Sequence, residues 1–276
     1  MTRALPLHAV VIGLCVVWIV PTVGLCINSF RSPQLVVSSG WWTTLFSPPR
    51  FTLQNYAAVL GTYHLGRGFL NSIAITLPGT VIPVTVAAFA AYALAWMRFP
   101  GREALFALIV GSLVVPLQVT LVPVFELLSA VGLVGTFPAA WLAHAAYGLP
   151  LAIYLLRNFM AALPKELLES ASIDGASPFT IFARLVLPLS WPALGALVVF
   201  QFLWVWNDLL VALIYIGGRP EVAPMTVMVS NLTNSLGQNW QLLTAAAFIS
   251  MLLPMGIFFA FQPSFVRGIL AGALKG

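Results

Sequence analysis

The sequence predicts an all-α integral membrane protein, a bundle of six transmembrane helices with a helical hairpin on its cytoplasmic side. Charged residues make up only 7% of the 276 residues, against about 25% in an ordinary soluble domain. Apolar residues reach 61%, and the mean hydropathy is +1.00. Because a water-facing surface is normally about a quarter to a third charged, this composition excludes a soluble enzyme, a nucleic-acid binder and a disordered tail.

Six stretches are apolar over about the 20 residues that a helix needs to cross a bilayer. They cover residues 5–27, 69–97, 105–125, 139–160, 193–216 and 242–261. The first stretch is too long for the apolar core of a signal peptide and has no small-residue cleavage site, so we expect it to be retained. We treat the whole chain, residues 1–276, as a single transmembrane domain.

The distribution of basic residues predicts the orientation of the bundle. With an internal N-terminus, the cytoplasmic segments hold Arg3, Arg98, Arg102, Arg157, Lys165, Arg184, Arg267 and Lys275. The external loops hold Arg31, Arg50, Arg67 and Arg219. Since cytoplasmic loops carry the excess of Lys and Arg, both termini and the loop at 163–192 are predicted to be cytoplasmic.

The segment 163–192 concentrates charge in an otherwise apolar chain and is typical of a soluble helical hairpin. Pro164 stands in the first turn of its first helix, where proline is favoured. The apolar and charged residues of that helix fall on opposite faces, so the helix is expected to lie flat rather than cross the membrane. Gly175 can take the positive φ that commonly ends a helix.

A second short helix begins at Ser177 and Pro178, an N-cap residue followed by a first-turn proline. Phe179 and Phe182 are expected to be exposed on a broad apolar arc of this helix, and Leu187-Pro188 then returns the chain to the membrane. Two interpretations are open at this point. The hairpin either lies at the interface and stabilises the bundle, or it is a docking surface for a cytoplasmic partner.

The spacing inside the hairpin resembles the EAA loop of ABC-importer permeases. That pattern reads Glu-Ala-Ala, three residues, Gly, nine residues, Ile, one residue, Leu-Pro. The sequence has Glu169-Ser170-Ala171, Gly175, Leu185 and Leu187-Pro188 at the same spacing, so Ser170 and Leu185 are the departures. In that family the loop forms coupling helices that sit in a groove on the ATP-hydrolysing subunit. The expected coupling residues are therefore Glu169, Ser170, Ala171, Ile173, Asp174, Gly175, Phe179, Phe182, Leu187 and Pro188.

Further motifs extend the resemblance over nearly the whole chain and place it in the carbohydrate branch, near the maltose-type second permease subunit. They are Asn55-Tyr56, Asn71-Ser72, Arg98 to Arg102, Pro116-Leu117-Gln118, Trp206-Asn207-Asp208 and the ending Gly268 to Gly276. The resemblance implies a type I, MetI-like bundle in a bacterial cytoplasmic membrane and uptake of a sugar, sugar alcohol or glycerophosphate-type solute. It also implies a second homologous permease, two ATPase subunits and an extracytoplasmic binding protein.

The sequence contains no motif that indicates enzymatic chemistry. It contains no Gly-x-x-x-x-Gly-Lys-Ser/Thr phosphate loop, so ATP is expected to be used by a partner and no cofactor by this chain. His8, His64 and His144 lack partners at metal-ligand spacing, so no metal site is predicted.

Asp208 lies well inside a predicted span. Because a carboxylate is costly to place inside a membrane, such residues usually have a function. With Asn207 and Gln201, Asp208 is a candidate for the translocation path, although a helix-packing role fits equally well. Two alternatives to sugar import stay open. They are a permease for another solute class and an ion-coupled secondary transporter, and the second would need inverted repeats and broken helices. We see neither in the sequence.

Overall fold

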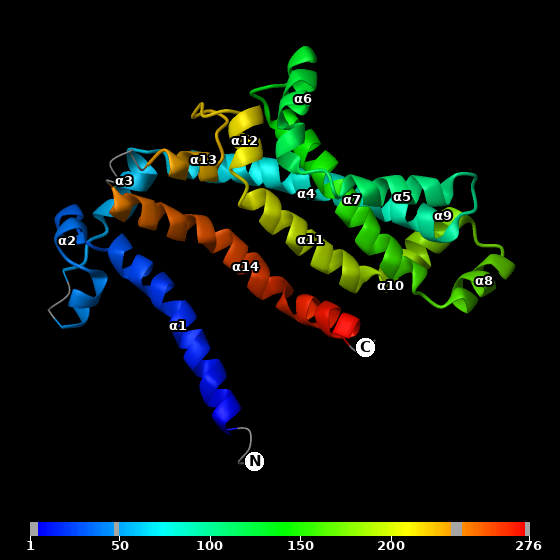
Figure 1. The fold of residues 1–276 in the computed structure, drawn as a ribbon, viewed down its shortest axis with the longest axis horizontal. Helices are drawn as coiled ribbons and strands as arrows, with labels where there is room; N and C mark the ends of the chain where they lie inside the picture. Colours follow the sequence, from blue (N-terminus) through cyan, green and yellow to red (C-terminus); the bar gives the residue numbers. More distant parts are fainter. Residues whose placement is uncertain (1–4, 47–49, 233–238, 274–276) are drawn as a thin grey trace. The chain divides into compact units, whose positions relative to one another are not determined.

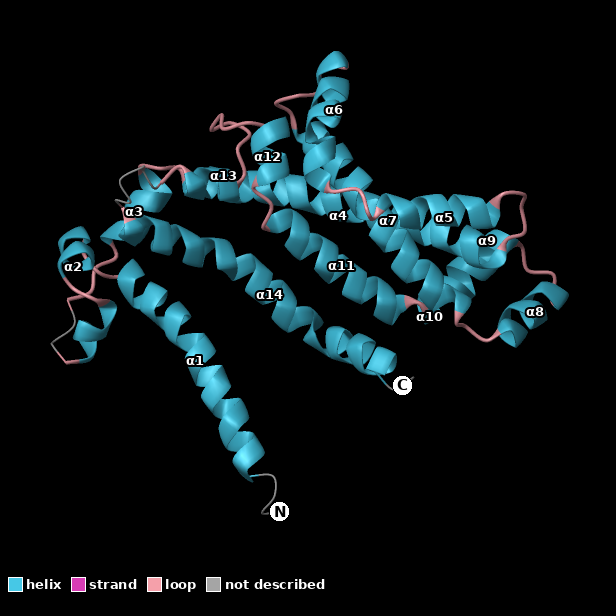
Figure 2. Cartoon of the chain, in the orientation of Figure 1, coloured by secondary structure: helices cyan, strands magenta, loops and turns pink. Residues whose placement is uncertain are grey.

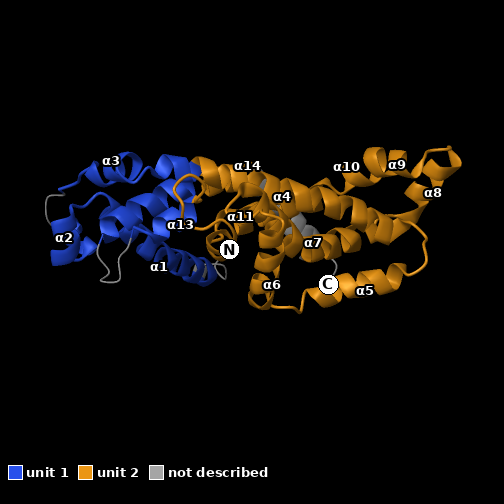
Figure 3. Cartoon of the chain, turned by 90° about the horizontal axis from the view of Figure 1, so that it is seen from above, with its two compact units in different colours: residues 1–69, 225–252 blue, residues 70–224, 253–276 orange. Residues whose placement is uncertain are grey.

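The computed structural model describes residues 5–46, 50–232 and 239–273, with side chains described as far as residue 260. Arg3, Lys275 and the last residues of the C-terminal motif lie outside the described residues. Figures 1 and 2 show helices joined by loops, with no strand drawn among the described residues. The chain divides into two compact units, residues 1–69 with 225–252 and residues 70–224 with 253–276 (Figure 3).

Among the described residues, four helices are long and apolar enough to cross a membrane. They are α1 (Leu5–Ser29), α4 (Leu65–Trp96), α7 (Phe137–Ala161) and α14 (Trp240–Ala273, of which the candidate span is Trp240–Ala260). Two bent helix pairs bring the number of candidate spans in the described residues to as many as six. One pair is α5 (Arg102–Ser112) with α6 (Leu117–Ala130), bent by 104°. The other is Pro178–Leu189 with α11 (Trp191–Trp206), bent by 74°.

The first unit contains α1, α2 (Pro33–Ser38), the 3₁₀ turn η2 (Trp41–Leu45), α3 (Gln54–Gly61) and α13 (Met225–Ser230). Arg31 is buried just after α1, with 1% of its surface exposed. Its guanidinium donates to Asn28 Oδ1 (3.0 Å), to the carbonyl oxygens of Leu35 (2.9 Å) and Ser39 (3.0 Å), and to Ser39 Oγ (2.6 Å). Since a buried charge needs such partners, Arg31 fixes the loop that follows α1.

The second unit is built on α4, α7 and α11, whose small residues let the helices approach closely. Two tryptophans join α4 to α7. Trp141 Nε1 donates to the carbonyl oxygen of Ala74 (2.8 Å), and Trp96 Nε1 donates to that of Met160 (3.0 Å). Because the bonds pair the early and the late parts of both helices, α4 and α7 run in parallel and are fixed at both ends.

The structure interrupts the helix within two of the predicted spans, 105–125 and 193–216. The first is interrupted at 113–116, where Pro116 supplies no backbone N–H and disfavours a helical residue before it. The second ends at Trp206 and resumes as α12 (Leu210–Tyr215). Asn207 Nδ2 donates to the carbonyl oxygen of Leu203 (2.7 Å), and Asp208 accepts from the first turn of α12. Broken helices, which the sequence did not reveal, are therefore present.

Candidate functional site

The hairpin consists of α8 (Lys165–Ile173), a turn at Asp174–Ser177, and a second helical segment. That segment is α9 (Pro178–Ile181), a π-helical turn η3 (Phe182–Val186) and α10 (Leu187–Leu189). Gly175 has φ +78°, as expected for the residue after a helix end. The N–H of Ala176 donates to the carbonyl oxygen of Ala171 (3.0 Å), and that of Gly175 to Ser172 (3.1 Å). These two bonds form a Schellman motif, so the turn is fully specified.

Ser177 begins the second helical segment in the predicted manner. Its Oγ accepts from the backbone N–H of Thr180 (3.2 Å) and lies 2.8 Å from Thr180 Oγ1. Pro178 follows in the first turn, where its missing N–H costs nothing. Both ends of the connection are thus closed by local hydrogen bonds, and the hairpin is a rigid element rather than a loose loop.

Phe182 does not lie on the exposed face that the sequence predicted. It is 4% exposed and packs against two aromatic rings of α4, Phe89 (centroids 4.8 Å apart) and Tyr92 (5.2 Å). The Tyr92 hydroxyl also donates to the carbonyl oxygen of Pro178 (3.0 Å). The α4 helix offers an apolar surface beside α9, and Phe182 covers it. Phe182 is therefore an anchor of the hairpin on the bundle.

Two large apolar side chains of the hairpin stay largely exposed, although the Phe179 ring lies 6.5 Å from the Phe182 ring, centroid to centroid. Ile173 is 86% exposed and Phe179 is 67% exposed. The turn between them contains the exposed residues Asp174 and Gly175. These residues form the exposed tip of the hairpin.

The remaining predicted coupling residues have mixed positions. Glu169 is exposed and pairs with Lys165 Nζ at 2.7 Å across one helical turn. The Ser170 hydroxyl donates to the carbonyl oxygen of Leu167 (3.1 Å) on the exposed side of α8. Ala171 and Leu187 are half-buried, whereas Pro188 is exposed. Part of the motif therefore faces outward, and part of it builds the hairpin itself.

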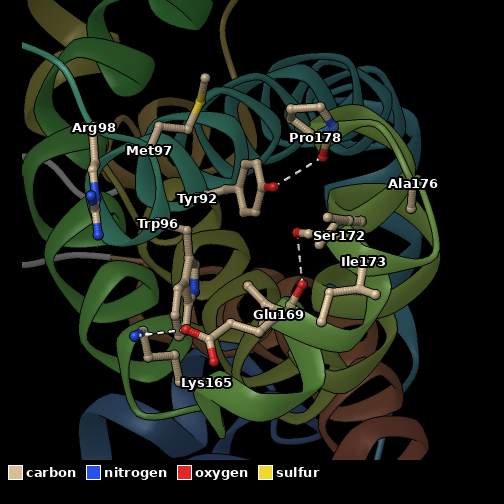
Figure 4. A pocket seen from close by; sticks show the side chains of 12 residues that line it. Tyr92, Trp96, Met97, Arg98, Lys165, Glu169, Ser172, Ile173, Ala176 and Pro178 are labelled. Atoms are coloured by element: carbon tan, nitrogen blue, oxygen red, sulfur yellow. Dashed lines mark hydrogen bonds and ion pairs between the residues drawn. The ribbon is translucent and has the colours of Figure 1, made fainter.

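A cavity of about 690 Å³ lies between the hairpin and the end of α4 (Figure 4). Its hairpin wall includes Glu169 and Ile173, and its opposite wall includes Tyr92 and Trp96 of α4 and Arg98, which follows α4. Sequence reasoning did not assign Tyr92, Trp96 or Arg98 to a site. An aromatic pair four residues apart, directly before the arginine-rich turn, was the signal that could have found them, because such residues share one face of a helix.

The predicted path residues Asn207, Asp208 and Gln201 do not converge on one site. Asn207 is exposed and bonds to its own helix. Gln201 is buried and donates to the carbonyl oxygen of Gly79 (3.2 Å), which joins α11 to α4. Asp208 accepts from the backbone N–H groups of Val211 (3.3 Å) and Ala212 (2.9 Å).

The Asp208 carboxylate also lies 3.7 Å from Nε2 of the buried His144. Gln201 and Asp208 therefore each have a packing or capping role in this structure. Asp208 in addition lines a cavity of about 770 Å³.

Apolar helices of membrane-spanning length, together with a rigid hairpin that carries an exposed apolar tip, are typical of a multi-pass membrane protein that docks a partner. The chain belongs to the family of binding-protein-dependent transport system inner membrane components, whose model matches residues 83–270. The predicted membership of the ABC-importer permeases and the predicted all-α membrane fold are both confirmed.

Relatives with known names support the same class. The chain is 55% identical over 276 residues to the osmoprotective compounds uptake permease protein GgtD of Synechocystis sp., covering 99% of this chain and 93% of that protein. It is 55% identical over 238 residues to the alpha-glucoside transport system permease protein AglG of Rhizobium meliloti, covering 84% of this chain and 63% of that protein. It is 34% identical over 234 residues to the trehalose transport system permease protein SugB of Mycobacterium tuberculosis, covering 83% of this chain and 84% of that protein.

Solved structures share the fold. A chain of a bacterial ABC transporter that imports the acidic polysaccharide alginate matches with a TM-score of 0.78 at 20% identity, covering 94% of this chain and 95% of that one. A chain of the MetNI methionine ABC transporter matches with a TM-score of 0.56 at 17% identity, covering 74% of this chain and 95% of that one. Helix arrangement is thus retained at identities too low to carry substrate information.

Proposed function

We propose that the chain is one permease half of an ATP-driven importer for a sugar or sugar-like solute. Its relatives at 55% identity are named for osmoprotective compounds and alpha-glucosides, which supports this solute class. A second permease would complete the path, two ATPase subunits would supply the energy, and an extracytoplasmic binding protein would deliver the solute. Both termini and the hairpin would face the cytoplasm of a bacterial cell.

The exposed tip of the hairpin is the observation that carries the coupling role. Ile173 and Phe179 are apolar, exposed and held on a closed turn. Burying one such side chain in a groove of the ATPase would contribute about 1.5–3 kcal/mol to association. Asp174 and Glu169 would add polar contacts at the edge, and Gly175 would keep the tip narrow. The ATPase would bind ATP, and this chain would bind no cofactor.

Movement of the ATPase would reach the spans through the anchors of the hairpin. A force on the tip passes to α4 through the Tyr92–Pro178 hydrogen bond and through the Phe182 ring. From α4 it passes to α7 through the bond from Trp96 Nε1 to Met160. Since packed elements move as bodies rather than deform continuously, the hairpin and the parallel pair α4 and α7 would tilt together.

Replacement of the tip residues in the complete transporter tests this role. Ile173→Ser and Phe179→Ser should each lower co-purification of the ATPase about tenfold or more, because a lost apolar contact of this size is worth at least 1.4 kcal/mol. Membrane abundance should stay normal, since both side chains are largely exposed. Phe46→Ser, at an 86% exposed phenylalanine outside the hairpin, is the matched control. Undiminished ATPase recovery with both tip variants would refute the coupling role.

A further inference from the structure

The two helix breaks open onto one cavity in the second unit. It has a volume of about 770 Å³ and is lined from α6 by Gln118 and Thr120, from α7 by Tyr147, from α11 by Trp204, and from the α11–α12 break by Asp208. Small-molecule sites in proteins have volumes of about 300–1,000 Å³. In secondary transporters, solute sites recur where membrane helices are interrupted, because the interrupted backbone lines a cavity there. The size and position of the cavity therefore fit a solute rather than a single water molecule.

Hydrogen bonds hold the polar wall of this cavity in place. The Tyr147 hydroxyl lies 2.8 Å from the hydroxyl of Tyr215 and 3.2 Å from Thr120 Oγ1. The Tyr215 hydroxyl donates in turn to the carbonyl oxygen of Leu121 (3.2 Å). Asp208 is fixed by the N–H groups at the start of α12. A wall that is ordered before a ligand arrives lowers the entropic cost of binding.

The chemistry of the wall selects among solutes. Trp204 and Tyr147 offer aromatic surface, and Gln118 is exposed to the cavity with no hydrogen-bond partner among the described residues. The described residues lining the cavity include one acid, Asp208, and no base. Aromatic rings pack against the C–H faces of a sugar ring, and amide and carboxylate oxygens accept from its hydroxyl groups. An anionic solute would instead be repelled by the carboxylate.

We propose that this cavity is a solute subsite supplied by this subunit and that it binds an uncharged polyhydroxylated compound of disaccharide size. The proposal rests on the proposed import function and specifies where this chain contacts the solute. Trp204 and Tyr147 stack on the solute, Gln118 and Asp208 accept from its hydroxyl groups, and Asp208 excludes anions. Of the three path residues predicted from the sequence, Asp208 alone belongs to this subsite.

Uptake by the complete transporter in proteoliposomes is the first test, with labelled trehalose and sucrose as probes. The binding protein, the partner permease and the ATPase are all present. Trp204→Ala should lower uptake at least about tenfold, because the ring loses its contact with the solute. Trp204→Phe should restore most of the uptake. ATP hydrolysis stimulated by the loaded binding protein should stay within about twofold of the wild type, since the coupling hairpin is untouched.

Trp191→Ala is the control for the first test, because Trp191 is a 65% exposed tryptophan on the same helix and outside the cavity. Uptake by Trp204→Ala at the wild-type level would overturn the subsite. An equal loss of uptake and ATP hydrolysis would also overturn it, in favour of a structural role for Trp204. Failure of the wild type to move either sugar with ATP would refute the solute class and the proposed function together.

Protection of a cysteine against labelling is the second test. Gln118→Cys is introduced after Cys15 and Cys26 are replaced by serine, and it is labelled with a methanethiosulfonate reagent. Trehalose should slow the labelling of position 118 several-fold, whereas Ser129→Cys, on the same helix but outside the cavity, should be unaffected. Equal rates with and without trehalose, or protection by glycerol phosphate instead, would overturn the proposal.

Discussion

The Tyr92 hydroxyl donates a hydrogen bond to the carbonyl oxygen of Pro178 over 3.0 Å. The donor stands near the end of α4, and the acceptor is the first residue of α9, 86 positions later in the chain. A carbonyl in the first turn of a helix normally accepts from within its own helix, so this bond adds a partner at no cost to helix geometry. It also places an element of the hairpin at a fixed distance from a membrane span.

Tyr92→Phe should weaken this attachment without unfolding the protein. Loss of one partly buried hydrogen bond costs about 1 kcal/mol, which lowers the melting temperature of a domain this size by about 2–4 °C. Uptake should fall more than the ATPase rate, because the ring still packs on Phe182 while the transmission becomes looser. Tyr154→Phe is the control, since the described residues offer the Tyr154 hydroxyl no hydrogen-bond partner. Identical melting temperature and uptake for both variants would contradict the role of the bond.

The stability lost on substitution of Gly175 should depend on the backbone conformation that the new residue tolerates, and not only on the size of its side chain. A Cβ there would meet no atom within 4 Å, so space is not the constraint within this chain, but φ is +78°. Gly175→Val should cost about 1–2 kcal/mol and disturb the turn, because a β-branched residue is strained in this region. Gly175→Asn should be tolerated best, since Asn adopts positive φ. Melting of the purified permease measures both, and equal losses would show that the turn relaxes to another conformation.

Gly148→Ala should displace Gln201. A Cβ at Gly148 would lie 2.6 Å from Gln201 Nε2, so the amide must move and give up its bond to Gly79. The expected loss is about 1–2 kcal/mol of stability, the cost of a buried polar group left unpaired. Gly111→Ala is the control, because a Cβ there meets nothing within 4 Å in α5. Replacement of Gln201 by Ala should reduce the additional effect of Gly148→Ala, and unchanged additivity would refute the coupling between them.

Topology predicts the accessibility of two engineered cysteines. Ser172→Cys, on α8, should resist an impermeant thiol reagent in intact cells, because the hairpin faces the cytoplasm. Ser38→Cys, at an exposed position after the first span, should react. Ser38 is preferable to Ser39, whose Oγ and carbonyl oxygen both accept from Arg31. Labelling at 172 and protection at 38 would invert the orientation.

The isolated chain should neither hydrolyse ATP nor transport solute. It has no phosphate loop, and the tip of its hairpin is unoccupied without a partner. Purified protein in proteoliposomes with ATP, and then with a proton or sodium gradient, provides the measurement. Ion-driven uptake by this chain alone would support a secondary transporter instead.

The hairpin could be predicted from the sequence because its ends are specified locally. Gly175, Ser177 and Pro178 each act within a few residues, through a positive φ, a side-chain cap and a fixed φ, and the structure has all three features. Phe182 could not be placed in the same way. Its exposure depends on the rings of α4, which are about 90 positions away in the chain. The apolar arc of the second helix alone does not show which of its side chains will pack against another helix.

The helix breaks escaped prediction for a related reason. Hydropathy averages over a span, and the residues at 113–116 and 207–209 sit between apolar neighbours on both sides. Pro116 and the Asn207-Asp208 pair were visible, but a proline inside a membrane helix commonly produces only a kink. Whether a kink becomes a break depends on tertiary contacts such as the cavity beside it. The walls of that cavity come from five helices, so no local pattern contains it.

The π-helical turn at Phe182–Val186 gives the hairpin a discrete way to rotate. A π turn holds one residue more than an α turn, and one residue of an α-helix corresponds to about 100° of rotation and 1.5 Å of rise. If the turn tightened to α geometry, the part of the hairpin before it, including Phe179 and the tip, would rotate and shift along the helix axis by that amount relative to α10. The tip of the hairpin would then move between two discrete positions rather than bend by a continuously variable amount.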